Sequence, residues 1–229
     1  MQDLALKAEN LLKKLISIKS FSFNEDKTAD YIENWFAING ISSSRSVNNV
    51  YALNKNFDLK KPNLLLNSHH DTVEPNLGYT NDPFKPILKD GKLFGLGSND
   101  AGISLVCLII VFLHFNNRDD LNFNIIILAS AEEEKSGDNG IKSVMPLLPK
   151  IDLAIIGEPT KMDVAIAEKG LIVFDLIVKG ESTHAAHQNN NNPIIKSSKI
   201  INKLSNFSFP KKSKLLGNVK LTVTQINAG

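Results

Sequence analysis

The sequence is poor in cysteine and has no dense cluster of basic residues. Its 229 residues include one cysteine, Cys107, so no disulfide can form within one chain, which is typical of a reducing compartment. We expect Cys107 to be a small core residue. Lys and Arg number 26 against 24 Asp and Glu, and no basic cluster is interleaved with aromatic side chains. This balance predicts no nucleic-acid partner.

The sequence also lacks the features of a membrane protein. The apolar run Ile103–Phe115 is shorter than the roughly 20 residues that a membrane-spanning helix needs. The first 18 residues carry Asp3 and Glu9 among apolar residues, and their spacing predicts an amphipathic helix instead of a signal peptide. We therefore expect no membrane contact and a cytoplasmic location.

Hydrophobic patterning predicts an α/β fold. Lys27–Asn39 has helical spacing and is followed by Gly40, a common stop signal. Three short apolar runs are nearly continuous, which predicts parallel strands buried on both faces: Asn63–Asn67, Asn124–Ala131 and Asp152–Ile156. The helical run Ile103–His114 lies between two of them, as a βαβ crossover requires. The pattern therefore indicates a parallel central sheet.

The pattern changes after Gly170. Leu171–Val178 and Val219–Ile226 alternate between apolar and polar residues, which predicts two strands, and Pro193–Leu204 between them predicts a helix. This β–α–β segment is typical of the start of a second, smaller domain. We expect one domain over residues 1–170 and part of another over residues 171–229.

Polar and acidic residues follow each predicted central strand or precede the crossover helix. These positions are His69, Asp71, Asp100, the triplet Glu132–Glu134, and Glu158. The carboxyl ends of parallel strands line one crevice, so we expect these side chains to converge. Carboxylates crowded together repel one another, and a histidine among several carboxylates suits Zn, Mn or Co. The pattern therefore predicts a metal site.

Each motif alone has a simpler interpretation. An acidic loop residue is usually solvated, and Gly95–Gly102 could be a tight turn that lacks the Gly-Lys-Ser/Thr ending of a phosphate-binding loop. The spacing of His69 and Asp71 adds a mechanism, because residues i and i+2 of an extended segment point the same way. Asp71 can then accept a hydrogen bond from the far ring nitrogen of His69. Four such motifs in order favour a site over chance.

Four strings carry a resemblance to a known family. They are NSHHDTVEP (67–75), GLGSNDAG (95–102), AEEEKSGDNG (131–140) and GEPT (157–160). In this order they resemble the dinuclear-zinc amidohydrolases, which include acetylornithine deacetylase, succinyl-diaminopimelate desuccinylase, aminoacylase and a glutamate carboxypeptidase. The resemblance implies a three-layer catalytic domain with a mostly parallel sheet, a smaller α+β lid or dimerisation domain present in part, and a homodimer of the full-length form.

The resemblance also implies a cofactor of two divalent ions, Zn or Co, and their ligands. His69 and Glu158 resemble ligands of the first metal, Asp100 the carboxylate that bridges both, and Glu134 a ligand of the second. Leu96 departs from the pattern, since many relatives have Arg there.

Three further residues receive catalytic roles from the same resemblance. Asp71 resembles the partner that orients His69, Glu133 the general base, and His184 the lid-domain histidine that helps to bind the substrate carbonyl or oxyanion. The resemblance implies that water, activated by the metals and Glu133, attacks the acyl carbon of an N-acyl amino acid.

The longer stretches Lys61–Asp82 and Ala165–Gly170 resemble the acetylornithine deacetylase branch most. We therefore expect hydrolysis of N-acetylornithine to ornithine and acetate, a step of arginine biosynthesis. Succinyl-diaminopimelate or succinylornithine desuccinylase and a metallo-dipeptidase remain alternatives. The family's last histidine ligand to the second metal has no counterpart before Gly229, so an inactive truncated remnant is also an alternative. For the chain alone we expect close to one equivalent of metal and negligible activity.

Overall fold

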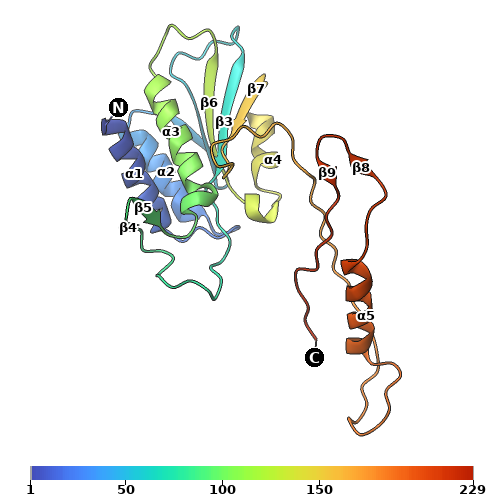
Figure 1. The fold of residues 1–229 in the computed structure, drawn as a ribbon. Coiled ribbons are helices and arrows are strands. Elements are labelled where there is room, and N and C mark those ends of the chain that lie inside the picture. The colour runs from blue at the N-terminus through green and yellow to red at the C-terminus, as the bar shows by residue number, and fades with distance from the viewer. Residues whose placement is uncertain (1, 229) are drawn as a thin grey trace. The chain divides into compact units, whose positions relative to one another are not determined.

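The computed structural model describes residues 2–228, and the chain divides into two compact units. The first unit ends at Met162 and the second begins at Asp163. The first unit has a mixed α/β architecture around a five-stranded sheet, which confirms the predicted fold class (Figure 1).

The sheet of the first unit has the strand order β1-β2-β6-β3-β7. The strands are β1 (Ser43–Ser46), β2 (Asn49–Leu53), β3 (Asn63–His69), β6 (Asn124–Ser130) and β7 (Leu153–Ile156). Strand β3 pairs in parallel with both β6 and β7, whereas β2 pairs antiparallel with β6 and with β1. Four of the five strands therefore run in one direction, and the carboxyl ends of β3, β6 and β7 lie at the same edge.

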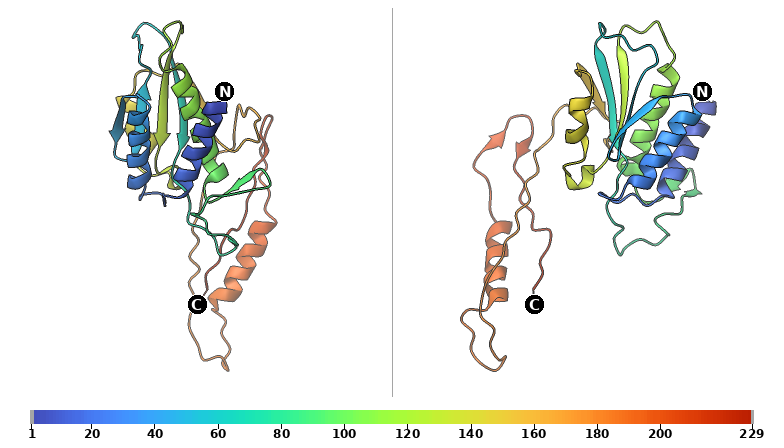
Figure 2. Two further views of the ribbon diagram at one scale, coloured as in Figure 1. Left: turned by 90° about the vertical axis from the view of Figure 1, so that its left-hand side faces the viewer. Right: turned by 180° about the vertical axis from the view of Figure 1, so that it is seen from behind.

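Helices lie on both faces of this sheet (Figures 1 and 2). One face is covered by α1 (Gln2–Ile16), α2 (Asp26–Ile38) and α3 (Ile103–Phe115), and the other by α4 (Ile141–Val144) with the 3-10 turn Met145–Leu147. Alternate residues of β6 serve the two layers, since Ile125 and Ile127 pack with the first set of helices and Ile126 and Leu128 with Val144. This alternation follows from the two-residue repeat of a strand and explains the continuous apolar run.

Helix α3 is the crossover between β3 and β6. By length and hydropathy Ser98–Phe115 is a candidate membrane span within the described residues. Five of its side chains are nevertheless buried in the unit (Leu105, Val106, Ile109, Ile110 and Phe112), as in the core helix of a globular protein. Cys107 is exposed, which corrects the expectation of a core position, because it lies on the side of α3 turned away from these residues.

Strand β7 corrects a second expectation. It was predicted to be buried on both faces, yet Leu153, Ile155 and Ile156 are all exposed. The strand lies at the edge of the sheet and pairs only with β3 among the described strands. An apolar run shows that a segment would be stabilised by burial. Whether other segments cover it depends on the tertiary structure.

The second unit contains the predicted helix, α5 (Pro193–Ser205), whose start is capped by the side chain of Asn192. The strands predicted over Leu171–Val178 and Val219–Ile226 are wrong for the described chain, which has only the short pair β8 (Lys212–Ser213) and β9 (Gly217–Asn218) there. Ile172 and Phe174 are about three-quarters exposed. Alternation stabilises a strand only when a partner strand supplies ladder hydrogen bonds and apolar cover. A further small hairpin, β4 (Ile87–Lys89) with β5 (Lys92–Phe94), belongs to the first unit.

Candidate metal centre

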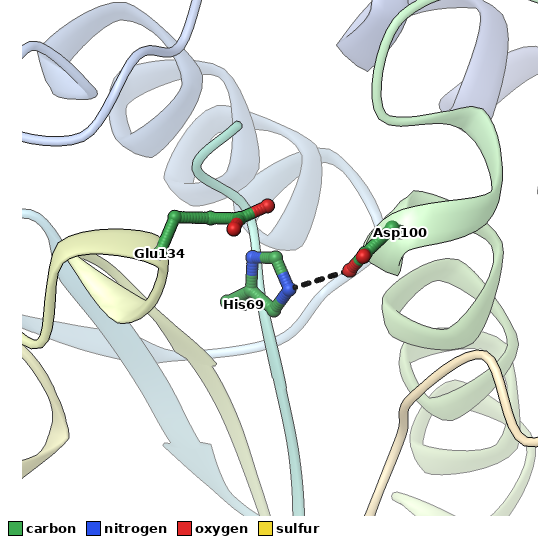
Figure 3. Close-up of side chains that lie close together, drawn as sticks. All are labelled: His69, Asp100 and Glu134. Carbon is green, nitrogen blue, oxygen red and sulfur yellow. Dashed lines mark hydrogen bonds and ion pairs between the residues drawn. The ribbon is translucent and has the colours of Figure 1, made fainter. Parts of the chain in front are cut away.

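His69 is the last residue of β3 and the centre of the acidic cluster. Its side chain is 1% exposed, and its Nε2 atom lies 3.2 Å from Oδ1 of Asp100. One ligand atom from each of His69, Asp100 and Glu134 lies within 4.8 Å of the others. Figure 3 shows the three side chains, which come from three different segments. The structure thus brings together residues that are up to 65 positions apart in sequence.

Asp71 holds the other ring nitrogen of His69. The Nδ1 atom lies 3.0 Å from the backbone oxygen of Asp71 and 3.4 Å from its carboxylate Oδ1. The predicted contact between the two residues is present, with the backbone oxygen as the nearer acceptor. Because Nδ1 is engaged in this way, Nε2 is the nitrogen that faces Asp100, the geometry that a metal-binding histidine requires.

Asp100 lies in a tight π-turn, Ser98–Gly102, that leads into α3. The turn is entered through Gly97, whose φ of 69° lies in the left-handed region, and a Cβ at this position would approach Cγ2 of Thr72 to 2.5 Å. Glycine meets both demands because it has no side chain. The peptide bond between Asp100 and Ala101 is cis. The glycines of the motif therefore shape the backbone that presents Asp100, and its carboxylate is 57% exposed toward solvent.

Glu133 and Glu134 begin a short 3-10 turn, Glu133–Lys135, just after β6. Their backbone N–H groups both donate to the carboxylate of Asp71, at 3.1 Å each, to Oδ1 and Oδ2 respectively. Oδ2 of Asp71 also accepts from the hydroxyl of Ser22 at 2.7 Å. The buried Asp71 therefore orients His69 and anchors the turn that carries the two glutamates.

Glu158 follows β7 and completes the group of acids around His69. Its Oε2 atom lies 3.9 Å from Nε2 of His69, and Oε2 of Glu133 lies 3.8 Å from the same atom. Bonds of about 2.0–2.2 Å to one ion place its ligand atoms about 3.3 Å apart. The distances of 3.2 to 3.9 Å around His69 are close to that value. The residues therefore fit a site for a divalent cation, with one imidazole and several carboxylates as donors.

The charge on His69 follows from its acidic neighbours. Burial by itself lowers the pKa of His69, but the hydrogen bond and charge of Asp71 and the charge of Glu158 outweigh it and raise the pKa to about 9. A proton on Nε2 and a metal ion compete for this position, so metal binding at neutral pH would release a proton. Burial also opposes ionisation of Asp71, but hydrogen bonds from His69 and Ser22 outweigh it and lower the pKa of that carboxyl.

The remaining carboxylates repel one another. Burial and the charge of Asp100 raise the pKa of Glu134, and burial and the charges of Glu133 and Asp100 raise the pKa of Glu158. Crowded carboxylates are held at a free-energy cost unless a cation neutralises them. The mutual repulsion of these carboxylates, together with the histidine and carboxylate donors present, is what a cation site requires.

Two further histidines, His184 and His70, lie outside the cluster of ligands around His69. His184 belongs to the second unit, where its Nδ1 accepts from the backbone N–H of Ala186 at 3.2 Å, and its catalytic role stays a prediction. His70, to which the sequence assigned no role, is buried, and its ring nitrogens contact Thr28 Oγ1 and the backbone oxygen of Asn48, both at 2.9 Å. Burial lowers the pKa of His70 to about 4, so this histidine is a neutral structural link.

Two residues near the site were missed by sequence reasoning. Ser22 bonds to Asp71, and Glu25 accepts a hydrogen bond from the backbone N–H of Glu132. Neither lies near a recognisable motif, and a glutamate just before a helix usually signals an exposed helix start. Their burial depends on segments that are distant in sequence.

Comparisons with known proteins show the family to which the chain belongs. The sequence model of peptidase family M20/M25/M40 matches residues 65–224. The chain is 31% identical over 237 residues to a succinyl-diaminopimelate desuccinylase of Rickettsia bellii, covering 94% of this chain and 60% of the relative. It is 30% identical over 243 residues to the enzyme of the same name from Rickettsia felis, covering 96% and 63%. The chain thus spans about 60% of the length of these relatives.

Solved structures share the fold. A metallo-carboxypeptidase of the M20 family from Sulfolobus solfataricus superposes with a TM-score of 0.54 at 22% identity, covering 69% of this chain and 37% of that chain. A dinuclear metal binding peptidase of the same family from Bacillus subtilis gives a TM-score of 0.53 at 18% identity, covering 68% and 43%. Because the family model matches most of the length of this chain, the chain belongs to peptidase family M20/M25/M40.

Proposed function

We propose that the cluster around His69 is a metal centre that hydrolyses an N-acyl amide. The observation that carries the proposal is the convergence of His69, Asp100 and Glu134 at the carboxyl edge of the sheet. Glu158 and Glu133 supply further oxygens within 4 Å of Nε2 of His69. In this proposal His69, Asp100 and Glu158 hold a first divalent ion, Zn or Co, and Asp100 and Glu134 contribute to a second.

The residues have distinct tasks in such a reaction. Bound divalent ions would acidify a water molecule and polarise the acyl carbonyl. Glu133, whose side chain is 53% exposed, can accept a proton from water and return it to the leaving amine. Asp71 keeps the ring of His69 and the backbone of Glu133 in place through the contacts described above. His184 remains our candidate for the group that binds the substrate carbonyl.

Metal binding is the direct test of this centre. After loading with Zn²⁺ or Co²⁺ and dialysis against metal-free buffer, we expect the chain to retain close to one equivalent of metal and clearly less than two, because the described residues offer the second position only Asp100 and Glu134. Asp100→Asn and Glu158→Gln should retain much less, whereas Asp119→Asn, an exposed acid before β6, should behave like the parent. Metal analysis by atomic emission provides the readout. A chain that retains no metal would refute the proposed centre.

Two substrates are candidates, and different observations favour each. The curated relatives carry the name succinyl-diaminopimelate desuccinylase, which favours an N-succinyl diamino acid. The stretches Lys61–Asp82 and Ala165–Gly170 favour N-acetylornithine, the main expectation from the sequence. We propose the succinylated substrate as the first candidate, because the identity to these relatives extends over 94% of the chain.

A paired assay separates these candidates. Release of free amine by the full-length enzyme is measured with each substrate at matched concentrations and excess Zn²⁺, and we expect a higher kcat/KM for N-succinyl-diaminopimelate. A higher value for N-acetylornithine would reverse the assignment. In the full-length enzyme, Glu133→Gln should lower kcat by about 10²–10⁴-fold while metal content stays constant. Loss of metal with retained turnover would show that Glu133 and Glu134 exchange roles. We also propose that the complete enzyme is a cytoplasmic homodimer.

A further inference from the structure

Glu25 is a fully buried carboxylate that the proposed reaction does not use. It lies just before α2, and three N–H groups donate to it. The backbone N–H of Phe23 donates to Oε1 at 2.8 Å, that of Glu132 to Oε1 at 3.1 Å, and the amide of Asn48 to Oε2 at 3.1 Å. An ionised carboxylate only accepts hydrogen bonds, so three donors suit it. Its partners come from three separate segments of the chain.

Its partner Glu132 has an unusual backbone. The φ of Glu132 is 57°, in the left-handed region that residues with a side chain rarely adopt. Such a conformation persists only when the surroundings fix it. Here the backbone oxygen accepts from the N–H of Gly137 at 2.9 Å, and the side chain accepts from the backbone and side-chain nitrogens of Asn139. The bond to Glu25 adds a contact across 107 residues of sequence.

Glu132 directly precedes the two glutamates of the metal centre. The backbone N–H groups of three consecutive residues, Glu132 to Glu134, are all held by buried carboxylates. Glu25 holds the first and Asp71 the other two. Ser22, three residues before Glu25, also donates to Asp71. The segment from Ser22 to Glu25 therefore supports the two segments that follow β3 and β6.

We propose that Glu25 is a positioning residue: its carboxylate fixes the left-handed turn at Glu132 and thereby the directions in which Glu133 and Glu134 leave β6. Glu25 touches neither metal nor substrate and acts through the backbone of Glu132. The inference rests on the proposed metal centre for its effect on metal binding, while its effect on the turn can be measured without metal.

Three variants test the contact in graded steps. Glu25→Ala removes the acceptor for all three N–H groups. Glu25→Gln keeps an oxygen for Phe23 and Glu132 but turns an N–H toward the amide of Asn48. Adding Asn48→Asp to Glu25→Gln restores the side-chain hydrogen bond between positions 25 and 48 with its donor and acceptor exchanged, while the bonds from the backbone N–H groups of Phe23 and Glu132 keep their direction. The new carboxylate can still accept from Arg45, which donates to Asn48 Oδ1 at 2.9 Å in the parent. This double variant should recover parental behaviour.

Asn124→Ala is the matched control for a buried polar residue. Asn124 is fully buried at the opposite end of β6, and its amide donates to the backbone oxygen of Asp58 at 2.8 Å and to Oδ1 of Asn63 at 2.7 Å. Its loss lowers stability without touching the turn at Glu132. Any effect common to Glu25→Ala and Asn124→Ala is therefore a general effect of destabilisation.

The first readout is amide hydrogen exchange of the metal-free chain, followed by mass spectrometry. In Glu25→Ala the amides of residues 132–134 should exchange at least about tenfold faster, since a bond to a charged acceptor is lost. The rise should exceed that of the β6 amides of residues 125–129. Asn124→Ala should not show this selective rise, and the double variant should reverse it. Parental protection of residues 132–134 in Glu25→Ala would overturn the proposal.

The second readout is titration of the full chain with Co²⁺, followed by visible absorption. The dissociation constant should rise at least about tenfold in Glu25→Ala, less in Glu25→Gln, and remain near the parental value in the double variant and in Asn124→Ala. Unchanged Co²⁺ affinity in Glu25→Ala, or an equal loss in Asn124→Ala, would overturn the positioning role. A parental chain that binds no Co²⁺ would overturn the proposed metal centre and the metal part of this proposal, while hydrogen exchange would still decide the role of Glu25 at the turn.

Discussion

The two ends of β3 and β6 are both built from buried polar side chains, but with different chemistry. At the amino ends Asn63 and Asn124 bond to each other and to the backbone of neighbouring loops. At the carboxyl ends His69 lies within 4 Å of the carboxylates of Asp71, Asp100 and Glu133. Neutral amides can satisfy each hydrogen bond at little electrostatic cost, whereas crowded carboxylates cannot. The buried amides at the amino ends therefore stabilise the fold, whereas the crowded carboxylates at the carboxyl ends provide negative charge that a cation could neutralise.

The largest expected effect comes from Asp71→Ala. The change removes the acceptor for the hydroxyl of Ser22 and for the N–H groups of Glu133 and Glu134, and it leaves the charge of His69 without its buried carboxylate partner. Breaking a buried ion pair in this way costs about 3–5 kcal/mol of unfolding free energy. Urea denaturation at pH 7 without metal measures the loss.

An aspartate at the amino end provides the control for that comparison. Asp152 accepts from the backbone N–H of Asn63 at 3.0 Å and from Lys150 at 2.9 Å, in contact with solvent. Asp152→Ala should destabilise the chain much less than Asp71→Ala. Equal losses of unfolding free energy in the two variants would show that a buried aspartate at the carboxyl end contributes no more to stability than a solvated one at the amino end.

A smaller effect is expected from Asn124→Ala at the amino end. The substitution removes both the donor that bonds to Asp58 and Asn63 and the acceptor of the backbone N–H of Asp58 at 2.9 Å. Buried groups left without partners cost about 1–3 kcal/mol. Thermal or urea unfolding should show this loss, whereas Zn²⁺ content after dialysis should match that of the parent. Loss of metal in this variant would contradict the separation of the two ends.

The smallest effect concerns pH and arises at the carboxyl end, from the buried His70. Burial lowers the pKa of His70 to about 4, against about 6.5 in an unfolded chain. Between these values the unfolded chain binds a proton that the folded chain does not, so stability falls as pH drops from 6.5 toward 4. The slope is at most about 1.4 kcal/mol per pH unit.

Urea midpoints at pH 7 and pH 5.5 test this dependence in the metal-free chain. His70→Gln should be less sensitive to acid than the parent, and His114→Gln, an exposed histidine of α3, should behave like the parent. His69 does not obscure the result, since its raised pKa places its contribution to stability below pH 6.5 and its loss between pH 6.5 and 9. An unaltered pH dependence in His70→Gln would assign the acid sensitivity to other groups.

The sequence by itself was sufficient for the elements whose signals are local. Helices α1, α2, α3 and α5 lie where the spacing of their apolar residues predicts them, and strands β3, β6 and β7 lie where continuous apolar runs predict them. Both signals are contained in a single segment of the chain. The convergence of His69, Asp100 and Glu134 also followed from sequence, since acids placed after parallel strands must meet at one edge.

Only the tertiary structure decided features that depend on distant partners. The exposure of β7 and the absence of ladder pairing over Leu171–Val178 reflect which neighbours a segment has, which its own pattern does not encode. The burial of Glu25 and the left-handed turn at Glu132 depend on a hydrogen bond across 107 residues. A buried carboxylate is stable only where several donors surround it, and those donors are brought together when the whole unit packs.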